Sequence, residues 1–379
     1  MLSGPSSARP SRVCFWRLLV LTSGAVLVLL PSTPAIAQMP RLLLPTANDA
    51  LFRGGGEAFY QYVRRDFKGE ITFPWEGGQY GFVRDPVETS DGLVYVHFHE
   101  GIDIKPLRRD PSGEPLDDVV SIAAGRVVHC SETAGHSNYG RYIVIEHRWG
   151  GSPYYSLYAH LSEIAVSPGA DVTAGQRIAR MGHTGSGIDR ERSHLHFEIN
   201  VMLTKKFEDW YVAGAPTEPN YHGNYNGLNL AGFDVAKFYL AQRGKPSLTI
   251  PEFLAAEEVF FKVLAPAPDQ PPDLVRMYPW MSGGTVSSTK PASWEISFTR
   301  SGVPLRVTPS NQTVTTPMLS FVRPASDAYW MLTRRLVYGA GSQARLSPYG
   351  RRLVELIMAL PKAGPAPVMS GEPGAARSQ

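Results

Sequence analysis

Residues 193–199 read SHLHFEI, a stretch in which polar and apolar side chains alternate. This alternation is typical of a β-strand with one buried face, because successive strand side chains point to opposite sides of a sheet. His194, His196 and Glu198 then share one face, while the apolar residues between them face a core. Two neighbouring imidazoles on one face indicate a site of chemistry, since one ring can bind a metal ion while the other faces its bound water.

The sequence around this stretch predicts an antiparallel β-sheet domain. From residue 93 to residue 199, short alternating or apolar runs are separated by Gly, Pro and Asp, as in all-β domains built from hairpins. The predicted fold class is therefore mainly β, with a mixed α/β extension towards the C-terminus. The runs that read as strands are residues 93–97, 102–105, 126–130, 142–147, 154–160, 177–181 and 194–201.

The first 37 residues have the features of a secretory signal peptide. Three arginines precede the apolar run Leu18–Leu30, which is too short to span a bilayer comfortably. Ala35-Ile36-Ala37 forms a small-residue cleavage site. We expect cleavage after Ala37, export of the mature chain and no membrane span after cleavage; an uncleaved anchor is the alternative.

Removal of this segment leaves a chain without excess charge. The segment holds three arginines and no acidic residue, so 34 basic and 34 acidic residues remain. Nucleic-acid binding requires a basic face, and we expect none. Cys14 precedes the apolar run and is not placed for lipidation, which leaves Cys130 as a single cysteine that we expect to be buried and inert.

The rest of the chain divides into segments of different composition. Helices are expected over residues 57–67, 234–242, 251–260 and 347–360, strands over 294–300 and 305–308, and a Pro-rich linker over 264–273. The predicted segments are the signal peptide (1–37), an N-terminal extension (38–90), the β domain (91–202), a loop-rich insertion (203–232), an α+β region of unknown role (233–360) and a disordered tail (361–379).

Further histidines in the β domain fit a metal site. Residues 99–103 read HEGID, in which His99 and Asp103 can curl around one ion, because imidazole and carboxylate are ordinary zinc ligands. His160, in YAHLS, ends an aromatic strand from which its ring can point into a groove. Three ligands, namely His99, Asp103 and either His194 or His196, would leave a fourth tetrahedral position for water, as in catalytic zinc sites.

The order HxxxD, YxHLS and HLHFE resembles the lysostaphin-type (LytM-like) zinc metalloendopeptidases, which cleave peptide bonds in bacterial peptidoglycan. The resemblance runs from about Val96 to Ile199 and covers less than a third of the chain. It implies an antiparallel β-sheet with a groove above the metal, so that residues 91–202 would be the peptidase domain. It also implies that His99, Asp103 and His196 bind one Zn²⁺ ion, while the catalytic histidines are His160 and His194.

These residues predict an exported zinc endopeptidase, periplasmic or extracellular and associated with the cell wall, with a peptidoglycan peptide as substrate. Zinc would lower the pKa of its water, and a histidine in the groove would transfer the proton. Two alternatives remain: a non-catalytic zinc-binding regulator that activates other cell-wall hydrolases, or a protein whose region 233–360 is a binding module. For that region we expect a packing extension of the same domain. Glu198 either orients a ligand histidine or lies at the surface.

Some features depart from the family pattern. The approach to the HLH pair, residues 182–193, is long and charged, with Ser193 where the family often has Pro, and residues 107–118 look like an insertion. We expect both segments and residues 203–230 to wall the groove. His97 is expected to be an outer contact of the metal site or solvated, and His147 to be exposed. The other histidines, expected to be structural or solvated, are His129, His136, His183 and His222.

Overall fold

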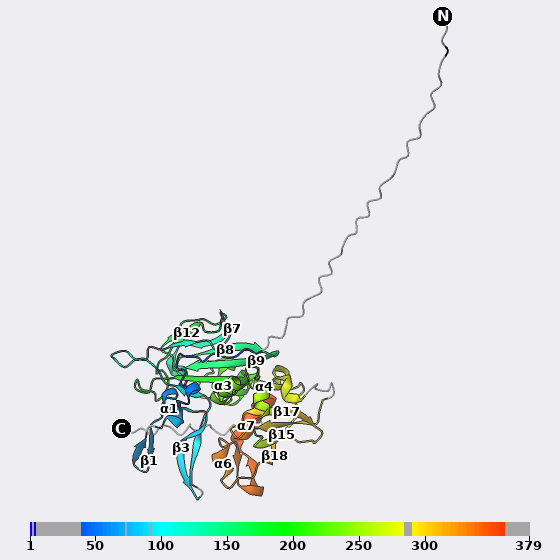
Figure 1. Cartoon of the computed structure of the whole chain (residues 1–379). Coiled ribbons are helices and arrows are strands. Elements are labelled where there is room, and N and C mark those ends of the chain that lie inside the picture. The colour runs from blue at the N-terminus through cyan, green and yellow to red at the C-terminus, as the bar shows by residue number, and fades with distance from the viewer. Residues whose placement is uncertain (2–3, 5–38, 73, 91, 284–289, 361–379) are drawn as a thin grey trace. The chain divides into compact units, whose positions relative to one another are not determined.

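The computed structural model describes residues 1, 4, 39–72, 74–90, 92–283 and 290–360 (Figure 1). Nearly all of the predicted signal peptide and the whole of the predicted tail, residues 361–379, lie outside these residues. Residues 39–360 fall within one compact unit. No helix among the described residues is both long enough and apolar enough to span a bilayer.

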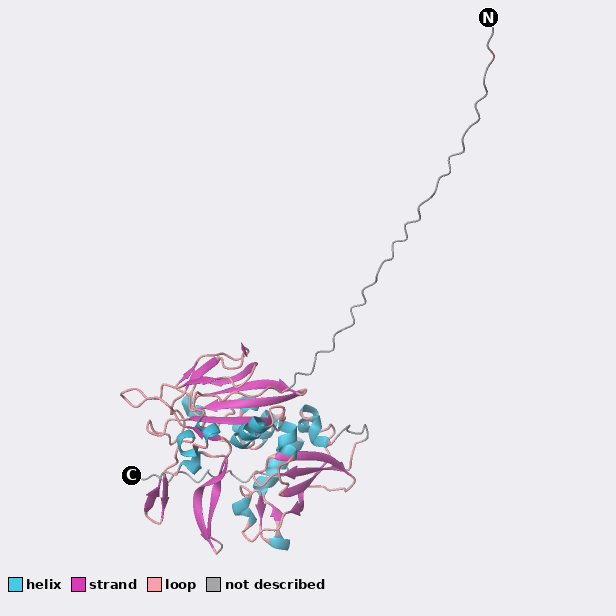
Figure 2. Ribbon diagram, viewed as in Figure 1, coloured by secondary structure: helices cyan, strands magenta, loops and turns pink. Residues whose placement is uncertain are grey.

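A seven-stranded sheet carries the centre of the chain, and every pairing in it is antiparallel (Figure 2). Its strand order is β11-β7-β8-β9-β13-β14, with β5 paired to β13. The prediction of a mainly β, antiparallel fold is therefore confirmed. The strands are β5 Ile102–Ile104, β7 Gly125–Ser131, β8 Tyr142–Trp149, β9 Ser152–Ala159, β11 Asp171–Val172, β13 Leu195–Met202 and β14 Leu230–Gly232.

The register of β13 brings distant parts of the sequence to one point. His196 lies opposite Asp103 of β5 on one side and opposite Ala159, the last residue of β9, on the other. The apolar face of the same strand is buried completely, since Leu195, Phe197 and Ile199 are all 0% exposed. A slip of one residue would expose this face, so core packing fixes the position of the histidines.

Smaller elements surround the sheet. A three-stranded sheet has the order β10-β12-β6, with β6 Asp118–Val120, β10 Glu163–Ile164 and β12 Arg177–Arg180. The N-terminal segment contains η1 Ala50–Arg53, α1 Gly56–Phe59, the hairpin β1 Arg65–Phe67 with β2 Glu70–Thr72, η2 Trp75–Gly78, and the hairpin β3 Gly81–Thr89 with β4 Gly92–His99. A further short 3-10 helix, the element type labelled η, is η3 Ala134–His136.

The predicted helix over residues 57–67 is wrong, because α1 ends at Phe59. Tyr60 instead forms an antiparallel bridge with Ile104, and the backbone N–H of Gln61 donates to the carbonyl oxygen of Asp103. Pairing with β5 therefore replaces the helical hydrogen bonds that local propensity favours.

The C-terminal region combines helices with a four-stranded sheet of order β17-β16-β15-β18. The helices over 234–242 and 347–360 are confirmed as α3, capped by Asp234, and α7, capped by Ser347. The predicted helix 251–260 is too long, because Phe261 already pairs in β15, and the expected linker 264–273 begins inside that strand. The elements are α2 Phe207–Ala213, η4 Gly223–Tyr225, η5 Gly227–Asn229, α3 Val235–Gly244, α4 Ile250–Ala255, β15 Phe261–Pro266, α5 Asp273–Met277, η6 Pro279–Ser282, β16 Ser293–Phe298, β17 Pro304–Ser310, β18 Met318–Val322, α6 Tyr329–Leu332, β19 Val337–Tyr338, η7 Gly341–Gln343, β20 Arg345–Leu346 and α7 Pro348–Met358.

This region contacts the end of β13 directly. The backbone N–H of Met202 donates to the Tyr278 hydroxyl at 2.9 Å, and Lys205 N donates to Asp273 Oδ2 at 2.8 Å. Figure 1 shows α3 and α4 beside the large sheet, with α7 and β15 beyond them. Residues 233–360 thus share buried contacts with the β domain.

Candidate metal centre

Three side chains from three strands converge on one point. His99 is the last residue of β4, Asp103 lies in β5 and His196 lies in β13. His99 Nε2 and His196 Nδ1 are 3.1 Å apart, and they lie 3.1 and 3.0 Å from Asp103 Oδ1. All three residues are buried, and they form the one group of three or more His, Cys, Asp or Glu among the described residues that could hold a metal ion.

Hydrogen bonds orient the two imidazoles so that lone pairs face this point. His99 Nδ1–H donates to the carbonyl oxygen of Gln79 at 2.7 Å, and His196 Nε2–H donates to Glu198 Oε1 at 2.7 Å. A neutral imidazole has one N–H, so His99 Nε2 and His196 Nδ1 carry the lone pairs. Tetrahedral zinc ligands lie about 3.3 Å apart, so the donor set and its spacing fit a zinc ion.

A proton takes the place of the cation when metal is absent. Burial lowers the pKa of His196, but its hydrogen bonds to Asp103 and Glu198 outweigh burial and raise that pKa to about 10. Burial and the charge of Arg84 lower the pKa of His99. Burial raises the pKa of Asp103, but His194, His99 and Arg84 hold it well below its usual range. A metal ion bound at this point would therefore displace a proton from the His196–Asp103 pair.

Two outer contacts come from the N-terminal extension, where sequence reasoning placed no site residue. The guanidinium of Arg84 in β3 lies 2.6 Å from Asp103 Oδ2, and its Nε donates to the Gly77 carbonyl oxygen. The Gln79 carbonyl oxygen fixes the ring of His99. The β3–β4 pairing places Arg84 opposite His97, and no spacing in the sequence indicates this contact. His97 itself is exposed and bonds to Asp85.

The predicted catalytic histidines lie beside the same point. His194 Nδ1–H donates to the Arg192 carbonyl oxygen at 2.7 Å, and its Nε2 lies 3.3 Å from Asp103 Oδ1. His160 Nδ1–H donates to the Thr184 carbonyl oxygen at 2.8 Å, and the ring centroids of His160 and His194 are 4.8 Å apart. His194 therefore presents Nε2 to the cluster, and the ring of His160 packs beside the rings of His194 and His196.

His160 adopts a backbone conformation that side chains disfavour. Its φ of 62° lies in the left-handed region, which is often occupied by a strained residue at a functional site. The flanking hydrogen bonds from His160 N to Tyr139 O and from Leu161 N to Arg141 O hold this conformation. Burial and the neighbouring rings of His194 and His196 keep the pKa of His160 well below its usual range, so the ring is neutral and can accept a proton.

The two departures from the family pattern are joined to each other. Arg109, from the insertion 107–118, donates to the carbonyl oxygens of Arg190 and Glu191 at 2.7 and 2.9 Å. Glu114, from the same insertion, lies 2.7 Å from Arg190 Nε. These contacts brace the loop that leads into His194. The expectation that these segments wall a groove remains a prediction.

The remaining histidines lie apart from the cluster. The prediction that His147 is exposed is wrong: it is 0% exposed, donates from Nδ1 to the Ala124 carbonyl oxygen and accepts from Ser156 Oγ at Nε2. His129 and His222 lie within 3.2 Å of each other, and His183 pairs with Glu114. A cavity of about 600 Å³ is lined by Tyr80 and Phe98, but by none of the five predicted site residues.

Glu198 lies among polar partners, as expected for a residue that orients a ligand histidine, and Cys130 is partly buried, as expected for an inert thiol. Glu198 accepts from His196, from the Tyr139 hydroxyl at 2.7 Å and from Asn200 Nδ2 at 2.8 Å, so it orients the predicted ligand. Cys130 is a free thiol, half-buried, and burial raises its pKa to about 11. The thiol is therefore protonated and unreactive near neutral pH.

Comparison with known proteins identifies the segment that carries this site. The profile of Peptidase family M23 matches residues 97–208. The chain is 36% identical over 116 residues to the murein hydrolase activator NlpD of Salmonella dublin. This alignment covers 29% of this chain and 26% of that protein. It is 42% identical over 69 residues to the peptidoglycan DD-endopeptidase ShyA of Vibrio cholerae, covering 18% and 15%. A zinc-containing peptidase from Vibrio cholerae aligns at a TM-score of 0.24 and 29% identity, covering 38% and 36%.

Proposed function

Because residues 97–208 match the profile of Peptidase family M23, we propose that this chain is an exported zinc-dependent endopeptidase that hydrolyses peptide bonds of bacterial peptidoglycan. The chain spans about a quarter of the length of NlpD, so the activity of the whole chain is proposed here and is not inferred from that relative. The observation that carries it is the convergence of three oriented donor atoms beside the imidazoles of His194 and His160.

The residues that would hold the ion are His99 through Nε2, Asp103 through Oδ1 and His196 through Nδ1. A bound zinc ion supplies Lewis acidity, which polarises the scissile carbonyl and makes water nucleophilic near neutral pH. Glu198 and the Gln79 carbonyl oxygen hold the two rings in the tautomers that ligation requires.

His160 and His194 would move the proton. Each ring holds its N–H at Nδ1 against a backbone carbonyl, so each has a free lone pair at Nε2. Nε2 can accept the proton of the attacking water and pass it to the leaving amine. Once protonated, the same atom donates to the negative oxygen that develops in the transition state.

The test uses His160→Ala with His183→Ala as its matched control. His183 also lies in the approach to the HLH pair, but it pairs with Glu114 and does not enter the cluster. We expect His160→Ala to retain zinc and to lose about 10²–10⁴-fold in the rate of fragment release from purified peptidoglycan, measured by mass spectrometry. His183→Ala should keep both properties. Full turnover by His160→Ala would contradict its role.

A second function is supported by the similarity to the murein hydrolase activator NlpD. In that case the metal site would stabilise a surface that stimulates another cell-wall hydrolase. Such a regulator would release no fragments by itself, would accelerate a second hydrolase, and would do so equally well as His160→Ala. All three predicted ligands are present here, which favours the enzyme. We further propose a periplasmic location for either function.

A further inference from the structure

An unusual turn follows α6 in the C-terminal region. Arg334 and Arg335 are consecutive and both left-handed, with φ of 52° and 63°, a conformation that L side chains rarely adopt. The fully buried Thr333 braces the turn: its hydroxyl donates to the Tyr329 carbonyl oxygen at 2.6 Å and accepts from Val337 N at 3.1 Å. Strained non-glycine residues of this kind persist where surrounding contacts enforce them, often at functional sites.

The turn sends the two arginines in different directions. Arg335 is exposed. Arg334 is half-buried, and its guanidinium carbon lies 4.8 Å from the ring centroid of Phe98, the residue before His99. It also interacts electrostatically with Glu100, the residue after His99. Arg334 therefore packs on the residue before a predicted metal ligand and acts electrostatically on the residue after it.

A second electrostatic interaction relates Arg334 to a tyrosine that packs on His196. Arg334 interacts electrostatically with Tyr139, whose ring centroid lies 5.4 Å from that of His196 and whose hydroxyl donates to Glu198. Tyr349 and Tyr80 also interact electrostatically with the guanidinium. A positive charge from residues 233–360 thus acts on residues that flank the predicted metal ligands His99 and His196.

The donors of this guanidinium are not used within the described part of the chain. No described residue accepts a hydrogen bond from the Arg334 side chain, and no described carboxylate lies within 4.0 Å of it. Glu100 attracts the guanidinium without bonding to it. A guanidinium has five N–H donors in a planar fork that matches a carboxylate, and a half-buried one gains from such a partner.

We propose that Arg334 is a specificity-determining residue that binds a free carboxylate of the substrate peptide. The proposal rests on the proposed peptidase function and names a feature of its substrate. An extended peptide advances about 3.3–3.6 Å per residue, so the carboxylate would lie within a few residues of the bond that is cut. Residues 233–360 would thereby contribute to substrate selection.

The experiment compares two peptides that differ only in one carboxylate, present in one and replaced by a carboxamide in the other. Hydrolysis is measured as kcat/KM, and binding is measured by calorimetry on the full mature chain loaded with zinc. Charge-assisted hydrogen bonds of this kind are worth about 10–100-fold, so the wild-type protein should prefer the carboxylate peptide by that factor in both assays.

The variants are Arg334→Gly and its matched control Arg335→Gly. Both remove an arginine from a left-handed position that glycine adopts freely, so neither should impair folding. Arg334→Gly should abolish the preference by weakening the carboxylate peptide alone, whereas Arg335→Gly should leave the preference intact. Arg334→Lys, which keeps the charge without the fork, should restore part of it.

The outcomes separate the two proposals. A wild-type protein that binds both peptides equally, or an Arg334→Gly protein that keeps the preference, overturns the role of Arg334 even if hydrolysis occurs. A wild-type protein that prefers the carboxylate peptide in calorimetry but cuts neither peptide nor peptidoglycan supports the subsite and overturns the peptidase function.

Discussion

Glu198→Gln tests the metal centre through a residue that does not touch the ion. Glu198 is 1% exposed and accepts 2.7 Å hydrogen bonds from His196 Nε2 and the Tyr139 hydroxyl. Glutamine keeps the volume but removes the negative charge that makes the imidazole a stronger ligand. Loss of such an outer carboxylate costs about 10–100-fold in metal affinity, or about 1.4–2.7 kcal/mol.

Competition with the proton decides how this deficit depends on pH. Burial lowers the pKa of His196, but Asp103 and Glu198 raise it to about 10, so Glu198 favours a proton as well as a metal ion. The ion carries twice the charge of the proton at the same nitrogen, and the variant therefore loses more metal affinity than proton affinity. Because proton competition is stronger in the wild-type chain and fades as pH rises, the deficit should be larger at pH about 9 than at pH about 7.

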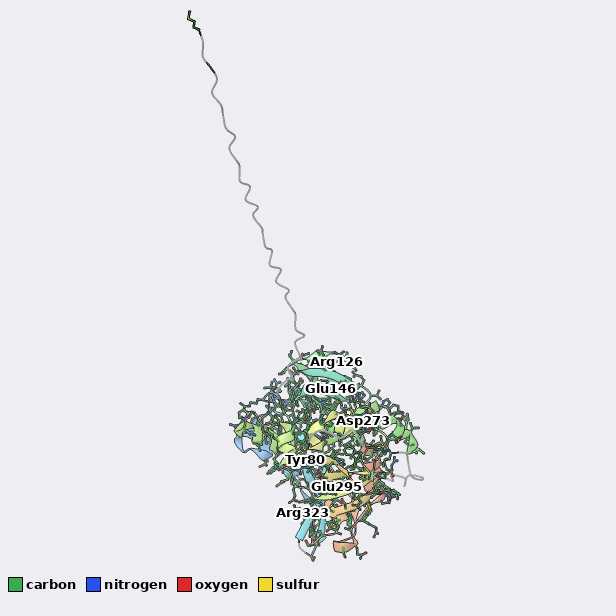
Figure 3. All side chains as sticks on the ribbon, turned by 90° about the vertical axis from the view of Figure 1, so that its right-hand side faces the viewer. Tyr80, Arg126, Glu146, Asp273, Glu295 and Arg323 are labelled. Atoms are coloured by element: carbon green, nitrogen blue, oxygen red, sulfur yellow. The ribbon has the colours of Figure 1, made fainter. Side chains whose placement is uncertain are left out.

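The assay is zinc competition against a chromophoric chelator at both pH values. The control is Glu146→Gln, the same substitution in β8; Glu146 is labelled in Figure 3. Glu146 pairs with Arg148 and accepts from the Tyr155 hydroxyl. This variant should bind zinc as the wild-type chain does. Equal zinc affinity of Glu198→Gln and wild type at both pH values would refute the assigned role of the carboxylate.

Three further predictions concern metal removal, the loop and acid stability. A chelator should lower the free energy of unfolding by about 4 kcal/mol relative to a sample in which free zinc is about 1,000-fold above Kd, and superimposable urea curves would argue against a structural metal site. Arg109→Gln should release the loop before His194 and lower kcat roughly tenfold at unchanged zinc content, because a 1 Å misplacement of a catalytic group can cost up to ~100-fold. The control Arg126→Gln loses only an exposed ion pair with Asp171 and should match the wild-type protein. His147 is buried in the neutral form, and burial lowers its pKa from 6.5 to about 4. The unfolded chain therefore binds the proton at higher pH than the folded chain does. The free energy of unfolding should fall as pH drops from about 6.5 to about 4, by about 2 kcal/mol at pH 5. Urea denaturation of His147→Asn should show a flatter dependence in this window, and an unchanged slope would exclude His147 as its source.

The central strands were predictable because one face of each is buried. In residues 193–199 the alternation alone separates Leu195, Phe197 and Ile199, all fully buried, from the face that carries the histidines. The helices α3 and α7 were equally predictable from sequence, because Asp234 and Ser347 are local N-caps. Their side chains accept hydrogen bonds from the backbone N–H groups three residues further along the chain.

Contacts between distant segments were not predictable in this way. Arg84 reaches Asp103 only because β3 pairs with β4, and the helix expected after Phe59 is replaced by a bridge from Tyr60 to Ile104. His147 follows a glutamate at what reads as a strand end, yet its ring is buried against Ser156 of the neighbouring strand. Local patterns contain no information about such partners.

The contacts of Gln79 and Arg84 bear on how the protein should be produced for biochemistry. Both residues precede the segment that matches the M23 profile, which begins at residue 97. A recombinant fragment trimmed to residues 97–208 would carry all three predicted ligands while lacking the carbonyl that orients His99 and the guanidinium that orients Asp103. Absence of activity in such a fragment would not refute the peptidase function, so biochemical work on this chain should use a protein that begins upstream of the β3–β4 hairpin.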